Sequence, residues 1–179
     1  LPISDRRLRP LVPGGGQERG RRGGTEAVPL AAAFAHALAL ASRERDAMRT
    51  HLSALSRTFE EALGAPETHG LRLTGSSDRS ARLPGHHSYA ASWVLGDDLV
   101  AALDHAGLAI STGSACISGS REPSEALLAC GHAIDEARGG IRISFGRTNS
   151  VEEARRAATI TAATCARIRE GLRVEAPFS

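Results

Sequence analysis

The sequence predicts an α/β or α+β fold, in which a long helix precedes a small sheet that helices cover on one face. Between Phe34 and Phe59, apolar residues recur at spacings of three, four or seven, which is the period of an amphipathic helix. After Gly64, short segments of strand type alternate with helical segments, separated by glycine and proline. The order β-β-α-β-α-β-α is therefore expected, without an internal repeat.

Residues 1–27 are rich in glycine and arginine and show no apolar period. The run PGGGQERGRRGGTE predicts an irregular loop, because glycine adopts backbone conformations that other residues avoid. The long helix then covers residues 28–64, and Gly64 and Pro66 end it. Arg45 interrupts its apolar stripe, which predicts one partly exposed turn or a bend.

Further strands and helices are expected beyond the long helix. Asp97 is the expected N-cap of the next helix, Gly107 its end, and Pro123 suits the first turn of the helix after that. Ser150 and Glu153 have the spacing of a capping box before the last helix. The expected strands cover residues 71–75, 88–95, 108–112 and 140–145, and the expected helices cover 97–106, 124–130 and 151–171.

Composition narrows the class of function. The net charge is only +2 and the arginines are scattered, so nucleic-acid binding is not expected. No apolar run is long enough to span a membrane, no signal peptide is visible, and three cysteines do not suggest a disulfide framework. A cytoplasmic protein is therefore expected. All 22 residues in the Lys+Arg total are arginine, which excludes chemistry that needs a lysine amine from this chain.

The loop STGSACISGS, residues 111–120, places Cys116 among small residues directly after an expected strand. An accessible loop suits a thiolate that must reach a substrate, but a lone cysteine is also a small apolar residue that fills space. Both interpretations stay open from the residues alone. Cys130 and Cys165 lie beside apolar residues on expected helices and are interpreted as structural, and no cysteine spacing indicates zinc.

Two further positions can hold an anion. Arg142 lies in the apolar strand segment GGIRISFGR, where its guanidinium can grip a carboxylate or can simply face solvent between two isoleucines. The glycine-rich loop 14–25 lacks the P-loop and dinucleotide-binding patterns, but its N–H groups and the Thr25 hydroxyl can donate to a phosphate.

His86 and His87 are adjacent on an extended segment, so their side chains point to opposite sides and do not easily bind one ion. We interpret them as loop residues. An unrelated Cys–His hydrolase is a poor alternative, because nothing in the sequence fixes a histidine near Cys116.

Three stretches together resemble one enzyme family. GGGQERGRRGGTE, STGSACISGSREPSEALLACG and IRISFGRTNSVEEARRA have the order and approximate separation found in the C-terminal portion of cysteine desulfurases of the NifS/IscS type, which belong to the class V aminotransferases. The resemblance covers nearly the whole chain. It is most specific at GSAC followed by EPS, which is similar to the class with its cysteine on a long mobile loop. GHHS at 85–88 only mimics the GHHCA of the other class.

The resemblance implies the C-terminal domain of a fold-type I enzyme that uses pyridoxal 5'-phosphate. Residues 1–27 would be the tail of the large cofactor-binding domain. Residues 28–64 would be a bridging helix, and residues 65–179 the small C-terminal domain.

The resemblance also implies a role for each candidate residue. Cys116 matches the nucleophile that takes sulfur from L-cysteine as a persulfide, leaves L-alanine, and passes the sulfur to an acceptor protein such as an iron–sulfur scaffold or a thiolation protein. Arg142 matches the arginine that grips the substrate carboxylate. Thr25 matches a threonine that reaches the cofactor phosphate of the other subunit in a homodimer.

The chain departs from the family pattern in important ways. The family's lysine that bonds to the cofactor, an aspartate and a ring-stacking histidine belong to the preceding domain, and this chain has no lysine. Gly24 also stands where serine is usual before the threonine. The expectation is an incomplete chain, a fragment or half of a split enzyme, that is inactive alone. The alternative is a non-catalytic remnant or split-enzyme subunit that acts as a dimerisation or persulfide-carrying module.

Overall fold

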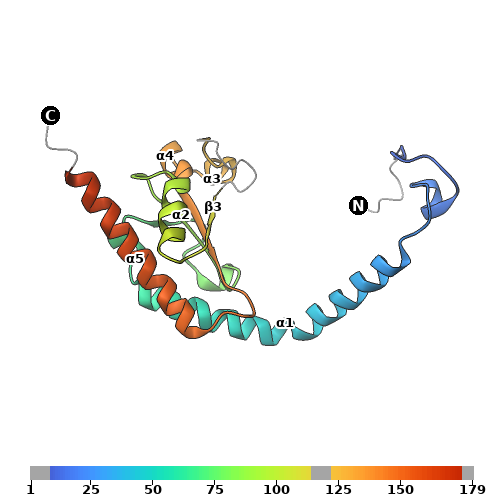
Figure 1. The fold of residues 1–179 in the computed structure, drawn as a ribbon, viewed down its shortest axis with the longest axis horizontal. Coiled ribbons are helices and arrows are strands. Elements are labelled where there is room, and N and C mark those ends of the chain that lie inside the picture. The colour runs from blue at the N-terminus through green and yellow to red at the C-terminus, as the bar shows by residue number, and fades with distance from the viewer. Residues whose placement is uncertain (1–8, 114–121, 175–179) are drawn as a thin grey trace. The chain divides into compact units, whose positions relative to one another are not determined.

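A computed structural model describes residues 9–113 and 122–174 (Figure 1). The chain divides into two compact units, Leu1–Arg45 and Asp46–Ser179. The division falls inside the long helix α1, Val28–Leu63. The expected helix is confirmed, and Gly64 follows it with a φ of +70°, the left-handed conformation that glycine readily adopts at a helix end.

The first unit contains the glycine-rich segment and the first part of α1. A short 3-10 turn, η2 (Gln17–Gly20), lies in this segment, and its residues Glu18 and Arg19 have positive φ. The N–H of Gly23 donates to the carbonyl of Val12 over 2.8 Å. The predicted irregular loop is therefore confirmed. Several large apolar residues of this unit are exposed: Val28, Leu30, Phe34 and Leu38.

The second unit is built on a four-stranded sheet of order β1-β2-β4-β3, in which every pairing is antiparallel. The central pair has the longest ladder, which runs from His86 opposite Ser144 to Ala90 opposite Gly140. All four expected strands exist, and each is shorter than predicted. They are β1 (Arg72–Leu73), β2 (His86–Ala90), β3 (Ser111–Thr112) and β4 (Gly140–Ser144).

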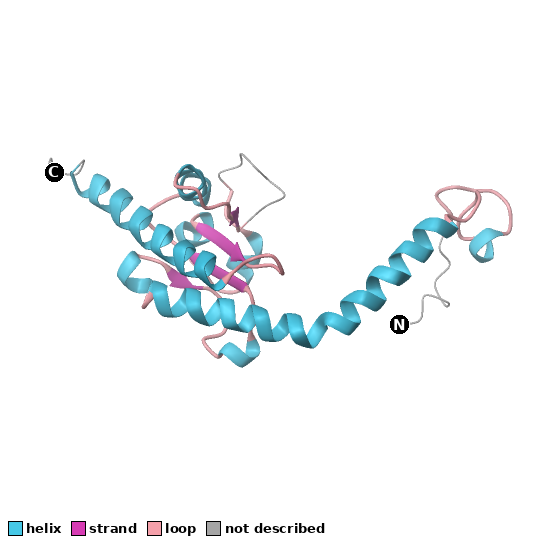
Figure 2. Cartoon of the chain, turned by 60° about the horizontal axis from the view of Figure 1, so that its bottom comes forward, coloured by secondary structure: helices cyan, strands magenta, loops and turns pink. Residues whose placement is uncertain are grey.

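Helices cover one face of this sheet, as Figure 2 shows for the second unit. The covering layer consists of the second part of α1 together with α2 (Gly96–His105) and α5 (Val151–Val174). Two short helices, α3 (Glu125–Ala129) and α4 (Ile134–Arg138), complete the unit. The expected fold class, a small sheet with helices on one face, is confirmed.

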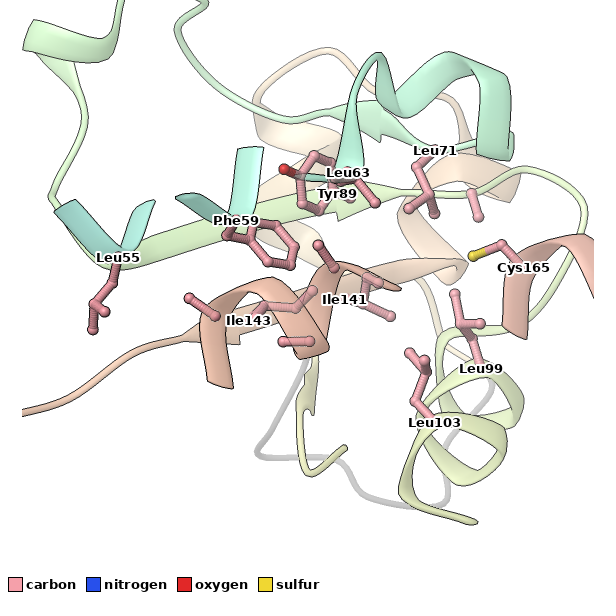
Figure 3. Close-up of a cluster of buried hydrophobic side chains, with 14 residues drawn as sticks. Leu55, Phe59, Leu63, Leu71, Tyr89, Leu99, Leu103, Ile141, Ile143 and Cys165 are labelled. Carbon is pink, nitrogen blue, oxygen red and sulfur yellow. The ribbon is translucent and has the colours of Figure 1, made fainter. Parts of the chain in front are cut away.

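The apolar core lies between the helical layer and the sheet (Figure 3). Cys165 is fully buried in it, which confirms the structural interpretation of this residue. Burial raises the pKa of the Cys165 thiol to about 11, so it stays protonated near neutrality. The core combines Leu55, Phe59 and Leu63 of α1, Leu99 and Leu103 of α2, and Tyr89, Ile141 and Ile143 of the sheet.

The interpretation of His86 and His87 as loop residues is wrong, because β2 begins at His86. The hydrogen bond from the N–H of Phe145 to the carbonyl of Gly85 extends the pairing with β4 beyond the histidines. The prediction that they face opposite sides is correct. His86 is half-buried with its Nδ1 3.2 Å from Ser144 Oγ, whereas His87 is 1% exposed and lies among core rings.

The ends of two helices can be compared with the capping residues that the sequence predicts. The predicted N-cap at Asp97 is wrong: α2 begins at Gly96, and Asp97 lies in its first turn, where a carboxylate stabilises the helix dipole. The predicted capping box is confirmed, because the N–H of Ser150 donates to Glu153 and the N–H of Glu153 donates to Ser150 Oγ. Helix α4 has no counterpart among the expected helices.

No helix in the described part of the chain combines the length and the apolar character that crossing a bilayer requires.

Candidate functional site

Arg142 lies on the central strand β4, between two buried isoleucines. Alternation along a strand therefore places its side chain on the face opposite the core. Its Nε donates to the carbonyl of Thr112 over 3.0 Å, and its Nη2 donates to Ser111 Oγ over 3.1 Å. The neighbouring strand β3 thus occupies the Nε–Nη2 edge of the guanidinium.

The other edge of the Arg142 guanidinium, between Nη1 and Nη2, keeps parallel N–H donors that match the two oxygens of a carboxylate. No carboxylate among the described residues forms an ion pair with Arg142. The flanking residues in register, Ser88 and Ser111, are small and polar. A half-buried, oriented cation that has no counter-ion among the described residues is a good receptor for an external carboxylate.

Cys116 lies outside the described residues. The described chain on either side of it is held by main-chain hydrogen bonds. The N–H of Gly113 donates to the carbonyl of Gly140 over 2.8 Å, and the N–H of Ser124 donates to the carbonyl of Ala137 over 3.1 Å. Thr112, which accepts a hydrogen bond from Arg142, stands four positions before Cys116 in the sequence.

Thr25 belongs to the first unit and is exposed. Its carbonyl accepts a hydrogen bond from Arg22 Nη1 over 3.0 Å, and the preceding Gly24 has a φ of +93°. Three residues later α1 begins, so the Thr25 hydroxyl stands shortly before a helix N-terminus, where the N–H of Val28 donates to the carbonyl of Glu26 and Pro29 has no N–H. Thr25 and Arg142 belong to different units.

A polar cluster that the sequence did not reveal surrounds Glu60 on α1. Its carboxylate pairs with Arg79 and, over 3.1 Å, with Arg82 Nη2. His87 Nδ1 lies 3.4 Å from Glu60 Oε1, but neither ring nitrogen has a hydrogen-bond partner in the described part of the chain. The partners are 19 to 27 residues apart, so no local motif indicated the cluster.

Burial, with a smaller contribution from the positive charge of Arg82, lowers the pKa of His87 to about 4. The ring is therefore neutral at neutral pH. Its centroid lies 4.8 Å from that of Phe59 and 5.9 Å from that of Phe145, so it packs as an aromatic core residue.

The lowered pKa of His87 predicts a pH-dependent stability. The unfolded histidine takes up its proton near pH 6.5, whereas the folded one resists until about pH 4. The contribution to stability is therefore complete above about pH 6.5 and is lost as the pH falls toward 4, by at most about 3 kcal/mol. Urea unfolding at pH 7.5 and 4.5 measures the loss. In His87→Phe the difference in the free energy of unfolding between the two pH values should be smaller than in the parent. The exposed control His105→Asn should keep the parental difference. A parental difference in His87→Phe contradicts the prediction.

Known proteins resemble this chain over most of its length. Residues 7–156 match the aminotransferase class-V family. The chain belongs to this family. The cysteine desulfurase of Gluconacetobacter diazotrophicus is 38% identical over 164 residues, which are 92% of this chain and 40% of that protein. The mitochondrial cysteine desulfurase of Saccharomyces cerevisiae is 42% identical over 147 residues, which are 82% of this chain and 28% of that protein. The chain thus spans less than half the length of these relatives.

Solved structures agree with the sequence relatives. A NifS-like protein from Rickettsia africae superposes with a TM-score of 0.69 at 27% identity, over 89% of this chain and 40% of that one. A second NifS-like protein gives a TM-score of 0.67 at 28% identity, over 87% and 38% of the chains. The described fold is therefore shared with NifS-like enzymes.

Enzymes of this family use pyridoxal 5'-phosphate. The residues present fit part of this cofactor: the exposed Thr25 hydroxyl suits its phosphate. The amine to which the cofactor is bonded in such enzymes has no counterpart in these 179 residues, because none of them is lysine.

Proposed function

We propose that this chain contributes the sulfur-accepting part of a cysteine desulfurase, in which Arg142 holds the carboxylate of L-cysteine and Cys116 accepts its sulfur. The observation that carries the proposal is the oriented guanidinium of Arg142. It is held by the strand that leads to Cys116, while its remaining donor edge has no carboxylate among the described residues. Relatives named cysteine desulfurase support the assignment.

The hydrogen bonds to Ser111 and Thr112 favour substrate binding in two ways. They fix the plane of the guanidinium before the carboxylate arrives, so little side-chain freedom is lost on binding. They also leave the Nη1–Nη2 edge for two parallel charge-assisted hydrogen bonds. The substrate is thereby oriented as well as held.

Cys116 performs the group transfer in this proposal. Its thiolate attacks the sulfur of the bound cysteine, so a sulfur–sulfur bond forms while the bond between that sulfur and the substrate β-carbon breaks. The electron pair stays with the carbon skeleton, which gains a proton and leaves as alanine. Pyridoxal phosphate, when bound, supplies the electron sink for the substrate carbon. A thiol of an acceptor protein then takes the outer sulfur from Cys116.

The length of the segment between Thr112 and Cys116 is compatible with these roles of Arg142 and Cys116. Cys116 is four residues beyond Thr112, and four extended residues reach at most about 14 Å. Cys116 is therefore within chain reach of a substrate held at Arg142. In this proposal the Thr25 hydroxyl contacts the cofactor phosphate in a homodimer. Residues 1–27 form the tail of the cofactor domain, residues 28–64 form the bridging helix, and residues 65–179 form the small domain.

The absence of lysine favours a second candidate function. Without an amine of its own, the chain receives a persulfide on Cys116 from another desulfurase and carries it to an acceptor, without releasing alanine. In this case Arg142 has no substrate to hold.

A complementation experiment tests the proposed function. The chain is mixed with pyridoxal phosphate, L-cysteine and the lysine-bearing part of the Gluconacetobacter desulfurase that it does not cover, and alanine is measured. We expect alanine from the mixture and none from the chain alone. Arg142→Gln should raise the KM for L-cysteine at least about tenfold, whereas Arg155→Gln, an exposed arginine on α5, should not.

The contrary outcome is equally clear. If the two parts co-elute as a folded complex and no alanine forms, the chain is not the sulfur-accepting part of a desulfurase. If a persulfide still appears on Cys116 after incubation with an active desulfurase, the carrier function replaces it.

A further inference from the structure

We propose that the pocket beside Glu60 binds a phosphate group. The pocket lies between the second part of α1 and the segment that runs from η4 (Arg79–Ala81) into β2, entirely within the second unit. Glu60 and His87 line it together with four arginines, which are Arg49, Arg57, Arg79 and Arg82. This site is independent of the desulfurase proposal, because it uses none of the residues assigned there.

The charges that line the pocket do not balance. Glu60 is the only carboxylate in its lining, and it is shared by Arg79 and Arg82. Arg49 and Arg57 are exposed and form no ion pair within the described part of the chain. With His87 neutral, the lining carries an excess of three positive charges. Such a concentration of like charge in a concave site attracts an anion.

Buried polar atoms without hydrogen-bond partners lie in the same lining. Arg82 Nε and both ring nitrogens of His87 are buried and have no hydrogen-bond partner among the described residues. His87 is 1% exposed, and its neutral ring carries one N–H. Buried polar groups in proteins nearly always have a partner, so the N–H of Arg82 Nε and the one N–H of His87 indicate that an acceptor completes the site.

A hydroxyl adds to the donor set. Ser56 Oγ accepts a hydrogen bond from the N–H of Gly85 over 2.7 Å, so its own O–H stays available to donate. Guanidinium forks, an imidazole N–H and a hydroxyl together match a group with several acceptor oxygens and two negative charges. A phosphate has both properties. A single carboxylate neutralises only one charge and accepts fewer donors at one point.

Calorimetric titration of the chain with inorganic phosphate and with phenyl phosphate, at constant ionic strength in chloride buffer, tests the proposal. We expect saturable binding of at least one of the two ligands. Binding of inorganic phosphate alone identifies the free ion as the ligand, and binding of phenyl phosphate identifies a phosphate ester. Arg82→Gln should raise the Kd at least about tenfold, because the substitution removes a charged hydrogen-bond donor. The control Arg155→Gln should leave the Kd unchanged.

A second variant keeps the test decisive if Arg82→Gln impairs folding. Arg57→Gln removes an exposed charge without breaking an ion pair in the described chain, so its melting temperature should match the parent's while its Kd rises several-fold. The proposal is overturned if neither ligand binds more tightly than chloride, or if binding is the same in Arg57→Gln and the parent.

Discussion

Replacing Cys116 with serine is expected to reduce sulfur uptake by this chain to background. In the proposed function and in the carrier function alike, the Cys116 thiolate forms the new sulfur–sulfur bond. A serine hydroxyl neither ionises near neutrality nor makes a stable bond to sulfur. The chain is incubated with an active cysteine desulfurase and L-cysteine, and intact-mass spectrometry then counts added sulfur atoms. The parent should gain sulfur, and Cys116→Ser should not.

Cys130 supplies the matched control. It is exposed, so Cys130→Ser should leave sulfur uptake at the parental level. Cys165 is not a competitor, because it is buried and burial raises its pKa to about 11. Uptake that disappears in Cys130→Ser and persists in Cys116→Ser would assign the acceptor role to Cys130, the C-cap residue of α3, and contradict the proposed role of Cys116.

The apolar periodicity of the sequence and the glycine and proline residues at the ends of elements predicted most of the fold, because both are local features of the sequence. The helices α1 and α5 are long enough for their apolar period to show, and glycines that end helices, such as Gly107 and Gly131, have the expected positive φ. Strand lengths were overestimated where tertiary contacts decide them. The apolar segment after Ala90 reads as strand, but the ladder with β4 ends at Ala90 opposite Gly140, and only one further hydrogen bond follows, from the N–H of Ala91 to the carbonyl of Gly139.

The candidate site was predictable only in part. The position of Arg142 on a strand followed from alternation, but its pinning by Ser111 and Thr112 depends on β3 pairing with β4, thirty residues away. The cluster around Glu60 depends in the same way on where α1 crosses β2. Residue types alone left Arg142 open as a carboxylate receptor or as a solvent-facing arginine, and only the sheet register showed which edge of its guanidinium β3 occupies.

Gly139→Ala is expected to destabilise the second unit severely. Gly139 ends α4 next to β4, and its φ of −92° suits alanine, so the obstacle is steric. A Cβ there would lie 1.7 Å from the carbonyl oxygen of Ala91 and 2.7 Å from that of Val94. Both are main-chain atoms that cannot rotate away, so we expect a loss of about 3 kcal/mol or more in the free energy of unfolding.

Gly146→Ala is the matched control for this substitution. The nearest atom to its Cβ would be Asn149 Oδ1 at 3.9 Å, so the free energy of unfolding should change by less than about 0.5 kcal/mol. Urea unfolding followed by circular dichroism measures both variants. Equal stability of the two would show that the sheet yields at Ala91. A loss of unfolding free energy in Gly139→Ala but not in Gly146→Ala would show that the close approach of Gly139 to Ala91 stabilises the sheet. The same sheet includes the pairing of β4 with β3, on which the orientation of Arg142 depends.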